Sequence, residues 1–270
     1  MEKYVFADGL VLPYIASRQN ARVTEASKLA DKKYRERSGM FLCEGVKLTL
    51  EAALYGRLCA VYLRESDAEK HRECVDAAQT AGGEVFVLSD AAFDKITTEK
   101  APQGIICLCE IEKRACEVPE SGNILFLDEL RDPGNLGTVL RSACAFGDFT
   151  VVLHSCADLY SPKTVRAAMG ALFKLNVLTV NDGAEFVENC RSRGRRVLGA
   201  ALVENSLKLG SFEAKDDDVV VIGNEGHGIS KEILELCDSF VMIPMNENTE
   251  SLNASVAASV LLWEYAKVVK

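Results

Sequence analysis

Short continuous apolar runs, separated by segments with helical spacing, recur along the second half of the chain and restrict its fold more than any other feature. The runs Ile124–Leu127, Val219–Ile222 and Phe240–Ile243 contain no charged residue. A strand that is apolar on both faces must be covered on both faces, which is typical of a parallel sheet between two layers of helices. The other expected strands of this half are Thr150–Leu153, Asn176–Val180 and Arg196–Leu202.

Helical spacing between these strands completes an alternating pattern, which predicts an α/β domain with ligand sites in the loops after the strands. The helices are expected at Asn135–Phe146, Pro162–Ala168, Ala184–Arg193, Ser230–Leu236 and Ser251–Val268. The first part of the chain alternates in the same way. Its expected helices are Arg18–Arg37, Val46–Tyr55 and Asp67–Ala81, and its expected strands are Phe41–Cys43, Cys59–Leu63, Glu84–Leu88 and Gly104–Cys109.

A charged segment ending in Pro, Ser and Gly, residues 110–122, has the composition of a linker. We therefore predict a small α/β domain over residues 1–115 and a larger one over residues 121–270. A chain of 270 residues with 48% hydrophobic and 26% charged residues can bury a core and is not disordered by composition.

No segment predicts insertion into a membrane. The longest stretch without a charged residue, Ser251–Trp263, is shorter than the roughly 18–20 apolar residues that a membrane-spanning helix needs. The first eight residues lack the basic start and apolar run of a secretory signal. We therefore expect a cytoplasmic protein with no membrane partner.

The ten cysteines are scattered, and no C-x-x-C pair occurs among them. A zinc site usually takes its thiolates from pairs that lie two to four residues apart. The pattern therefore predicts no metal site and reduced cysteines that pack as small apolar residues.

Three strands are followed by loops rich in glycine and carboxamide side chains. The loops are Asp128–Thr138, with Arg141 on the next helix, Gly223–Ser230, and Asn246–Ser255. Glycine allows the backbone to approach a ligand closely, and carboxamides orient polar groups. No phosphate-binding loop, dinucleotide-binding glycine pattern, nucleophile elbow or H-E-x-x-H pair is present. The chemistry is therefore not hydrolysis by a familiar nucleophile.

These loops resemble the three motifs of the SpoU or TrmH family of RNA ribose 2′-O-methyltransferases, in the trefoil-knotted SPOUT class. The matching residues are Asp132–Gly137 with Arg141, Gly223–Gly226 with Gly228, and Ile243–Met245 with Ser251–Asn253 and Ser255. Upstream, Phe41–Lys47 and Pro102–Gly104 resemble the N-terminal substrate-binding domain of the family, which has an L30e-like fold. The resemblance thus implies a knotted methyltransferase domain with a parallel sheet behind a small L30e-like α/β domain.

The resemblance implies S-adenosyl-L-methionine as the cofactor, with Gly223, Ile243 and Leu252 lining its site. Arg141 resembles the catalytic arginine of the family. Because a guanidinium is effectively always protonated, we expect it to stabilise the emerging alkoxide and to bind phosphate. The remaining catalytic candidates are Asn135 and Asn253, which would position the nucleotide or Arg141, Glu225, which would pair with Arg141, and Ser251, which would hydrogen-bond in the same cluster.

The implied function is methylation of a ribose 2′-hydroxyl in structured RNA, with ribosomal RNA (23S) favoured over transfer RNA. The implied assembly is a homodimer. One departure is Glu247, where many relatives have glycine. It motivates the main alternative, a catalytically silent RNA-binding or ribosome-assembly relative. A nucleotide-binding α/β enzyme of another class is a third interpretation, which the missing phosphate loops disfavour.

Charge limits how such a protein binds RNA. The formal net charge of −9 argues against coating nucleic acid by bulk attraction, so contact should be local. We expect RNA contact at a basic cluster made of Arg18, Arg22, Lys28, Lys32, Lys33, Arg35 and Arg37. A second cluster, made of Arg191, Arg193, Arg195 and Arg196, is typical of a solvated helix end. His227 is expected to be a turn residue, and the isolated His71 and His154 are expected to serve only packing or the surface.

Overall fold

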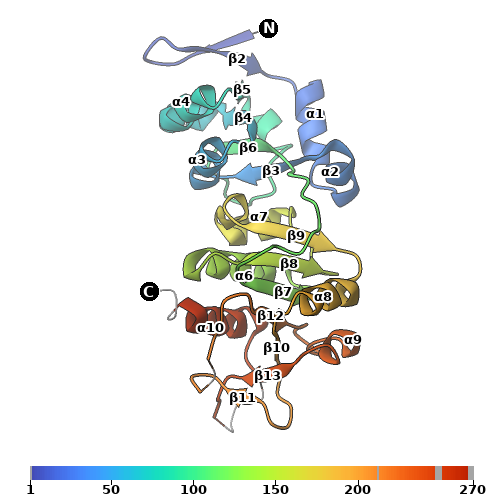
Figure 1. Ribbon diagram of the computed structural model, residues 1–270. Coiled ribbons are helices and arrows are strands. Elements are labelled where there is room, and N and C mark those ends of the chain that lie inside the picture. The colour runs from blue at the N-terminus through green and yellow to red at the C-terminus, as the bar shows by residue number, and fades with distance from the viewer. Residues whose placement is uncertain (1, 212, 247–250, 267–270) are drawn as a thin grey trace. The chain divides into compact units, whose positions relative to one another are not determined.

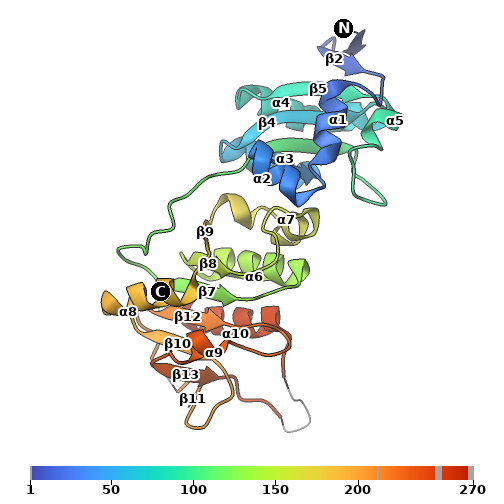
Figure 2. The ribbon, with the colours of Figure 1, turned by 90° about the vertical axis from the view of Figure 1, so that its right-hand side faces the viewer.

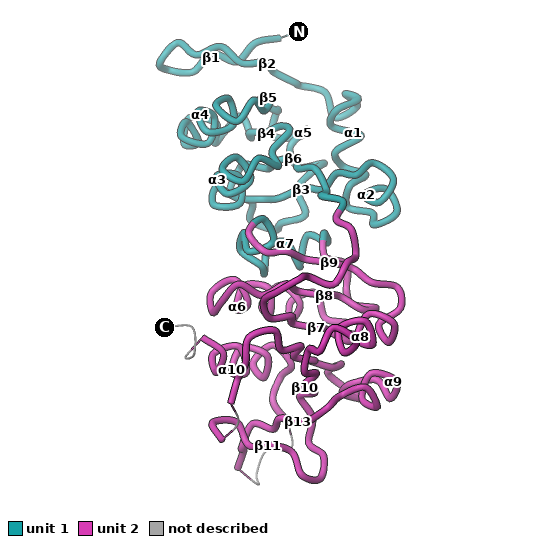
Figure 3. The backbone as a smooth tube through the Cα atoms, in the orientation of Figure 1, with its two compact units in different colours: residues 1–113, 160–173 teal, residues 114–159, 174–270 magenta. Residues whose placement is uncertain are grey.

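The computed structural model describes residues 2–211, 213–246 and 251–266, and the chain divides into two units (Figure 3). Unit 1 comprises residues 1–113 together with 160–173, and unit 2 comprises residues 114–159 and 174–270. Segment 160–173 therefore leaves the second half of the sequence to pack within unit 1. Each unit has its own sheet.

Unit 1 contains a mixed sheet of six strands in the order β1-β2-β5-β4-β6-β3. Its strands are β1 (Glu2–Val5), β2 (Val11–Ile15), β3 (Met40–Glu44), β4 (Leu58–Arg64), β5 (Glu84–Leu88) and β6 (Ile105–Glu110). Strands β2, β5 and β4 run parallel, whereas β3 and β4 both pair antiparallel with β6. The hairpin β1–β2 is an addition that the sequence patterns did not predict.

Helices cover both faces of this sheet. Figure 1 shows α3 (Val46–Leu54) and α4 (Arg72–Thr80) on one face and α1 (Ala21–Lys28) and α2 (Lys32–Ser38) on the other. The short α5 (Asp90–Phe93) packs its Phe93 into the same core cluster as Val23 of α1. Segment η1 (Glu65–His71) precedes α4, and α7 (Pro162–Ala168) and η2 (Ala171–Phe173) come from the inserted segment.

The single helix expected over Arg18–Arg37 is two helices. Asn20 caps α1, and the side chain of Asp31 accepts a hydrogen bond from the backbone N–H of Tyr34 to cap α2. At this second cap a new helix begins, and its Arg35 side chain is buried. Arg35 is 3% exposed and donates to the carbonyl oxygen of Leu29, so its expected contact with RNA is wrong.

Unit 2 contains an all-parallel sheet of seven strands in the order β11-β13-β10-β12-β7-β8-β9, as the apolar runs predicted. Its strands are β7 (Ile124–Asp128), β8 (Thr150–His154), β9 (Asn176–Val180), β10 (Val197–Ala200), β11 (Leu207–Lys208), β12 (Val219–Ile222) and β13 (Ser239–Met242). All five residues of β7 and all four of β12 are buried. Strand β11 is too short to leave a pattern in the sequence. The trefoil knot stays a prediction.

Two layers of helices cover this sheet. Helices α6 (Pro133–Phe146) and α10 (Ala254–Ala266) lie on one face, and α8 (Gly183–Ser192) and α9 (Lys231–Leu234) lie on the other (Figure 1). Figure 2 views the sheet from the side of α8 and α9. The α8 and α9 face buries Phe126, Phe186 and Ile233 in one apolar cluster. No helix among residues 2–211, 213–246 and 251–266 is long and apolar enough to span a membrane.

The second arginine cluster is only in part a solvated helix end: Arg191 and Arg193 are exposed, whereas Arg195 is 6% exposed. Its guanidinium donates to the carbonyl oxygens of Pro119 and Gly122, and that of Arg193 donates to Val118. These arginines thus hold the segment before β7 against the rest of unit 2. Because carbonyl oxygens carry no sequence signature, composition alone could not reveal these partners.

Candidate active site

Strands β7 and β12 are parallel neighbours although the chain visits β8 through β11 between them, so a topological switch point lies at their carboxyl ends. Such a point is where open α/β sheets bind ligands. Ile222 pairs with Leu127, and the first and second glycine-rich loops therefore start side by side.

The first loop leads directly into a helix. The side chain of Asp132 caps α6 by accepting from the backbone N–H of Asn135 at 2.8 Å, and Pro133 occupies the first helical turn. Both features favour a helix start at this position. Asn135 is therefore not the N-cap. Its side chain is free to reach the other two loops.

The second loop is a tight turn closed on itself. Asn224 and Gly228 exchange two backbone hydrogen bonds, and Oδ1 of Asn224 accepts from the N–H of Gly226 at 2.8 Å. Nδ2 of Asn224 donates to the carbonyl oxygen of Glu129 and so joins the second loop to the first. A Cβ at Gly223 would lie 2.2 Å from the backbone of Gly228 and Ile229, so only glycine fits there.

A buried carboxylate braces the base of the second loop. Asp128, which ends β7, is fully buried, and its Oδ2 accepts from the N–H of Ser230 at 2.7 Å. Its Oδ1 lies 2.7 Å from Nδ1 of His154 at the end of β8. This role of His154 differs from the packing or surface role expected from the sequence. The available signal was an aspartate that ends a fully apolar strand, since a buried carboxylate requires partners.

One chain of hydrogen bonds connects the three motif loops. Oε1 of Glu225 accepts from Nδ2 of Asn135 at 3.0 Å, and Oδ1 of Asn135 accepts from Nδ2 of Asn253 at 3.0 Å. Oδ1 of Asn253 in turn accepts from the N–H of Ser255 at 2.9 Å in the first turn of α10. The structure thus brings three of the five predicted catalytic residues together and fixes the amide of Asn135 from both ends.

Glu225 also accepts hydrogen bonds from the backbone N–H groups of Arg131 and Asp132. Partial burial alone would raise the pKa of Glu225, but the hydrogen bonds from Asn135 and from the backbone outweigh it and lower the pKa below its ordinary value. The carboxylate is therefore ionised at neutral pH and acts as an acceptor, not as a proton donor.

A cavity of about 470 Å³ opens beside this network, within the usual size range of small-molecule sites. Gly223, Ile243 and Leu252, the three predicted cofactor residues, all line it, and so do Glu225 and Ser251. Most other lining side chains are apolar, among them Leu202, Val241 and Leu261. The cavity therefore offers apolar walls with backbone polar groups at the second loop.

Two predicted catalytic residues lie outside the hydrogen-bond chain. Arg141 is exposed on α6, and the described residues give it no ion pair, so the expected pairing with Glu225 is not observed. Ser251 is exposed at the cavity, and its hydroxyl has no hydrogen bond to the described residues. Glu247 lies outside the described residues.

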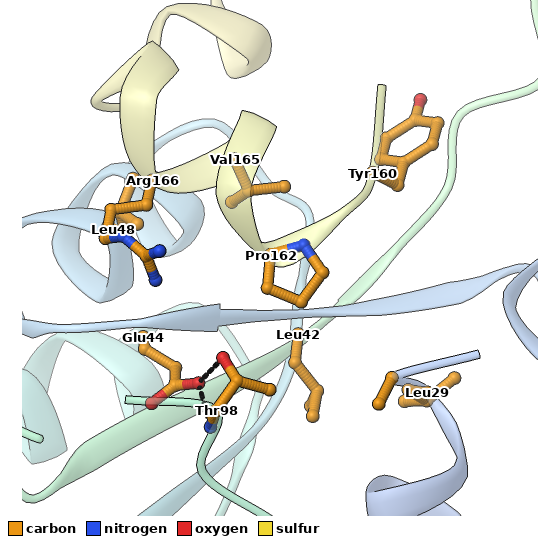
Figure 4. Close-up of a pocket in the computed structure, with 10 residues that line it drawn as sticks. Leu29, Leu42, Glu44, Leu48, Thr98, Tyr160, Pro162, Val165 and Arg166 are labelled. Carbon is orange, nitrogen blue, oxygen red and sulfur yellow. Dashed lines mark hydrogen bonds between the residues drawn. The ribbon is translucent and has the colours of Figure 1, made fainter. Parts of the chain in front are cut away.

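A hollow in unit 1 is too small to be a second ligand site. It lies between β3 and α7 and is lined by Leu42, Glu44, Thr98, Pro162 and Arg166, among others (Figure 4). Its volume of about 10 Å³ accommodates one water molecule at most. Glu44 is already bonded to the N–H and hydroxyl of Thr98, at 2.8 and 2.6 Å.

Comparison with known proteins accounts for both units. Residues 122–263, more than half of the chain, match the model of the SpoU rRNA methylase family. The chain belongs to the SpoU rRNA methylase family. Residues 20–107 match the MRM3-like substrate binding domain. The resemblance of the three motifs and of the N-terminal domain is thereby confirmed.

Curated relatives and solved structures agree with this assignment. The 23S rRNA (guanosine(2553)-2′-O)-methyltransferase RlmP of Bacillus subtilis is 31% identical over 92% of this chain and 97% of its own length. The 23S rRNA (uridine(2479)-2′-O)-methyltransferase of Streptomyces viridochromogenes is 30% identical over 91% of this chain and 89% of its own. An AdoMet-bound rRNA methyltransferase from Sinorhizobium meliloti superposes with a TM-score of 0.84 at 27% identity, over 96% of this chain and 99% of that one.

Proposed function

We propose that this SpoU methylase transfers a methyl group from S-adenosylmethionine to a ribose 2′-hydroxyl of 23S ribosomal RNA. The observation that carries the proposal is the hydrogen-bond chain from Glu225 through Asn135 to Asn253, which fixes all three motif loops beside one cavity. Two curated relatives that span nearly the whole chain carry 23S rRNA in their names, which supports the choice of RNA.

The cavity fits the cofactor. Gly223, Ile243 and Leu252 would hold it, and at Gly223 the backbone of Gly228 and Ile229 packs where a side chain would otherwise lie. The AdoMet-bound structures of the Sinorhizobium protein and of AviRb, a SpoU methyltransferase from Streptomyces viridochromogenes, support the same cofactor. When bound, S-adenosylmethionine supplies an electrophilic methyl group. The apolar lining would exclude water from the reacting centre.

Other residues near the cavity would orient the RNA and stabilise the charge that develops on the 2′-oxygen. Asn135, held by Glu225 and Asn253, presents a fixed amide that orients the nucleotide. Arg141 would stabilise the 2′-oxyanion and bind phosphate, since it is always protonated and no described acidic group neutralises it. Ser251 supplies a free hydroxyl at the cavity.

The decisive experiment compares 2′-O-methyl maps of 23S rRNA from a deletion strain and its parent. We expect one methylated site to disappear and to return with the wild-type gene but not with Arg141→Ala. That variant should bind S-adenosylmethionine with an affinity within a few-fold of wild type, as calorimetry would measure. Cofactor binding with an unchanged methylation map would instead favour the catalytically silent relative.

We also propose that the protein is a homodimer. Val256 and Trp263 lie two helical turns apart on α10 and are 47% and 50% exposed, and Phe146 of α6 packs edge-on against Trp263. An exposed apolar stripe on the helix pair that carries Arg141 suits a second copy of this chain. Trp263→Glu should give a monomer in light scattering. A dimer of unchanged stability would contradict this interface.

The cytoplasm is the proposed location. All ten cysteines are free in the structure, and five of them are not fully buried, as a reducing compartment allows. Fractionation with detection of the untagged protein tests this assignment. Recovery in a membrane or secreted fraction would contradict it.

A further inference from the structure

Three cysteine side chains meet in the core of unit 1, where the proposed methyl transfer does not use them. Cys43 on β3 is directly opposite Cys107 on the antiparallel strand β6. Cys109 lies two residues beyond Cys107, and its side chain therefore points to the same face of the sheet. The three thiols thus come from two neighbouring strands that form a rigid platform.

The sulfur atoms are already close together. Sγ of Cys109 lies 3.9 Å from Sγ of Cys43 and 3.7 Å from Sγ of Cys107, and all three lie within 4.8 Å of one another. For bonds of about 2.3 Å between one central atom and sulfur, pyramidal bond angles place the sulfurs about 3.4–3.8 Å apart. The three thiols could therefore share one central atom with only small movements.

The part of the chain that the structure describes offers the cluster no fourth His, Cys, Asp or Glu ligand. All three side chains are fully buried, and among the described residues no other His, Cys, Asp or Glu belongs to the cluster. Thr49 of α3 is also fully buried, and its hydroxyl is bonded to the carbonyl oxygen of Gly45. A closed zinc site needs four ligands, so three sulfurs alone do not satisfy it.

Charge decides which three-coordinate centre suits the cluster. Three thiolates around a monovalent ion leave a net charge of −2, and around a divalent ion −1. A net charge is unfavourable in a fully buried site, and the cluster itself contains no basic group. A trivalent centre leaves no net charge. The geometry and the charge balance therefore select a trivalent thiophilic metalloid.

We propose that Cys43, Cys107 and Cys109 form a binding site for one trivalent arsenic or chemically similar metalloid. The reaction with arsenous acid is a condensation: three As–O bonds break, three As–S bonds form, and the three thiol protons leave in three water molecules. No oxidant or reductant is required. The product is neutral and links β3 to β6.

Full burial sets the rate of this reaction. The helix α3 packs over the strands that carry the cluster, so arsenous acid gains access only when this part of unit 1 opens. Binding should therefore be slow in native buffer and faster in mild urea. Because the product joins two strands of the native sheet, binding should stabilise the folded state.

The test incubates the full-length protein with sodium arsenite and measures its mass under non-denaturing conditions. We expect one arsenic atom per chain, with the loss of three protons, and a higher Tm. Cys43→Ala and Cys107→Ala should each abolish the adduct and the shift in Tm. Cys74→Ala is the matched control, because Cys74 is buried in the same unit but lies outside the cluster, and it should keep both.

X-ray absorption at the arsenic edge should then show three sulfur neighbours at one distance. The absence of an adduct in the wild-type protein would overturn the proposal, and so would an adduct that persists in both cluster variants. Two sulfur neighbours in place of three would overturn it as well. Should Cys107→Ala fail to fold, Cys109→Ser provides the same comparison with a smaller change in packing.

Discussion

Glu225 shows what one residue contributes to this site. Its carboxylate accepts from Nδ2 of Asn135 and from two backbone N–H groups of the first loop. Glu225→Gln retains the shape of the side chain but replaces one carboxylate oxygen, an acceptor, with an NH₂ group. This NH₂ group would face the N–H donors that the carboxylate now binds. Hydrogen bonds to charged groups contribute about 1.5–3 kcal/mol, so kcat/KM should fall by about 10- to 100-fold in a methyl-transfer assay on rRNA from the deletion strain. Glu232→Gln, an exposed neighbour on α9, should leave the rate unchanged.

The same variant reports the ionisation of Glu225. Because its pKa is lowered in the folded protein, its contribution to stability is present above the pKa of the unfolded chain and is lost as pH falls through the folded pKa. The difference in Tm between wild type and Glu225→Gln should thus be constant from neutral pH down to about pH 5 and narrow only below about pH 4. A difference that closes near neutral pH would show that the carboxyl group is protonated there.

For single residues, the sequence pointed to side chains that the structure brings together, but not to all of their partners. The motif pattern pointed to Glu225, Asn135 and Asn253, which the structure joins. It paired Glu225 with Arg141, whereas the structure pairs Glu225 with Asn135 and the backbone. Distances between side chains on different loops depend on how the strands are ordered, and no local pattern contains that order. For the same reason, neither the contact between Asp128 and His154 nor the cluster of three thiols could be predicted from the sequence.

The second loop is an element whose backbone leaves no room at one position. A Cβ added at Gly223 would lie 2.2 Å from the backbone of Gly228 and Ile229, whereas one added at Gly226 would meet only Oδ1 of Asn224 at 3.4 Å. Gly223→Ala should therefore push the two sides of the loop apart and weaken S-adenosylmethionine binding by at least 10-fold in calorimetry. Gly226→Ala, the matched control, should bind within a few-fold of wild type. Equal S-adenosylmethionine affinities of the two variants would contradict the close approach of the Gly228 and Ile229 backbone to Gly223.

The linker segment depends on one buried arginine. Arg195→Ala removes the donor from the carbonyl oxygens of Pro119 and Gly122. Hydrogen bonds from a charged donor contribute about 1.5–3 kcal/mol each, so the free energy of unfolding should fall by about 2–4 kcal/mol in urea titrations. Arg191→Ala, which removes an exposed ion pair with Asp238, should cost less than about 1 kcal/mol. Similar losses in the two variants would mean that Arg195 does not hold the linker.

Among the elements, those built from local signals were predicted well. The fully apolar strands β7 and β12 and the helix α6 have clear patterns, and their bounds differ by at most two residues from those expected. The hairpin β1–β2 and strand β11 were missed, because β1 and β11 are short and carry no continuous apolar run and because Pro13 interrupts the strand pattern of β2. The helix expected over Arg18–Arg37 broke at Asp31, where a side-chain cap outweighed the helical spacing.

For the whole molecule, the net charge of −9 restricts how RNA can be bound. Several members of the basic cluster are already neutralised: Glu84 binds Arg22, Glu25 binds Lys28, and Arg35 is buried. Lys33 and Arg37 are exposed on α2 and have no acidic partner among the described residues. Arg18, which precedes α1, is also exposed and without an acidic partner among these residues. On α2, phosphate binding should therefore concentrate on Lys33 and Arg37.

Replacing both cations should separate local binding from bulk charge. Lys33→Gln with Arg37→Gln should lower the slope of log affinity against log salt concentration by about 0.7–0.9 for each phosphate that the protein no longer neutralises. Lys28→Gln with Lys70→Gln changes the net charge equally, but each of these lysines already lies within 2.8 Å of a carboxylate oxygen. This control should therefore nearly keep the wild-type slope. Binding of a 23S rRNA fragment at several salt concentrations measures both, and equal slopes for the two double variants would show that RNA binding depends on net charge and not on Lys33 and Arg37.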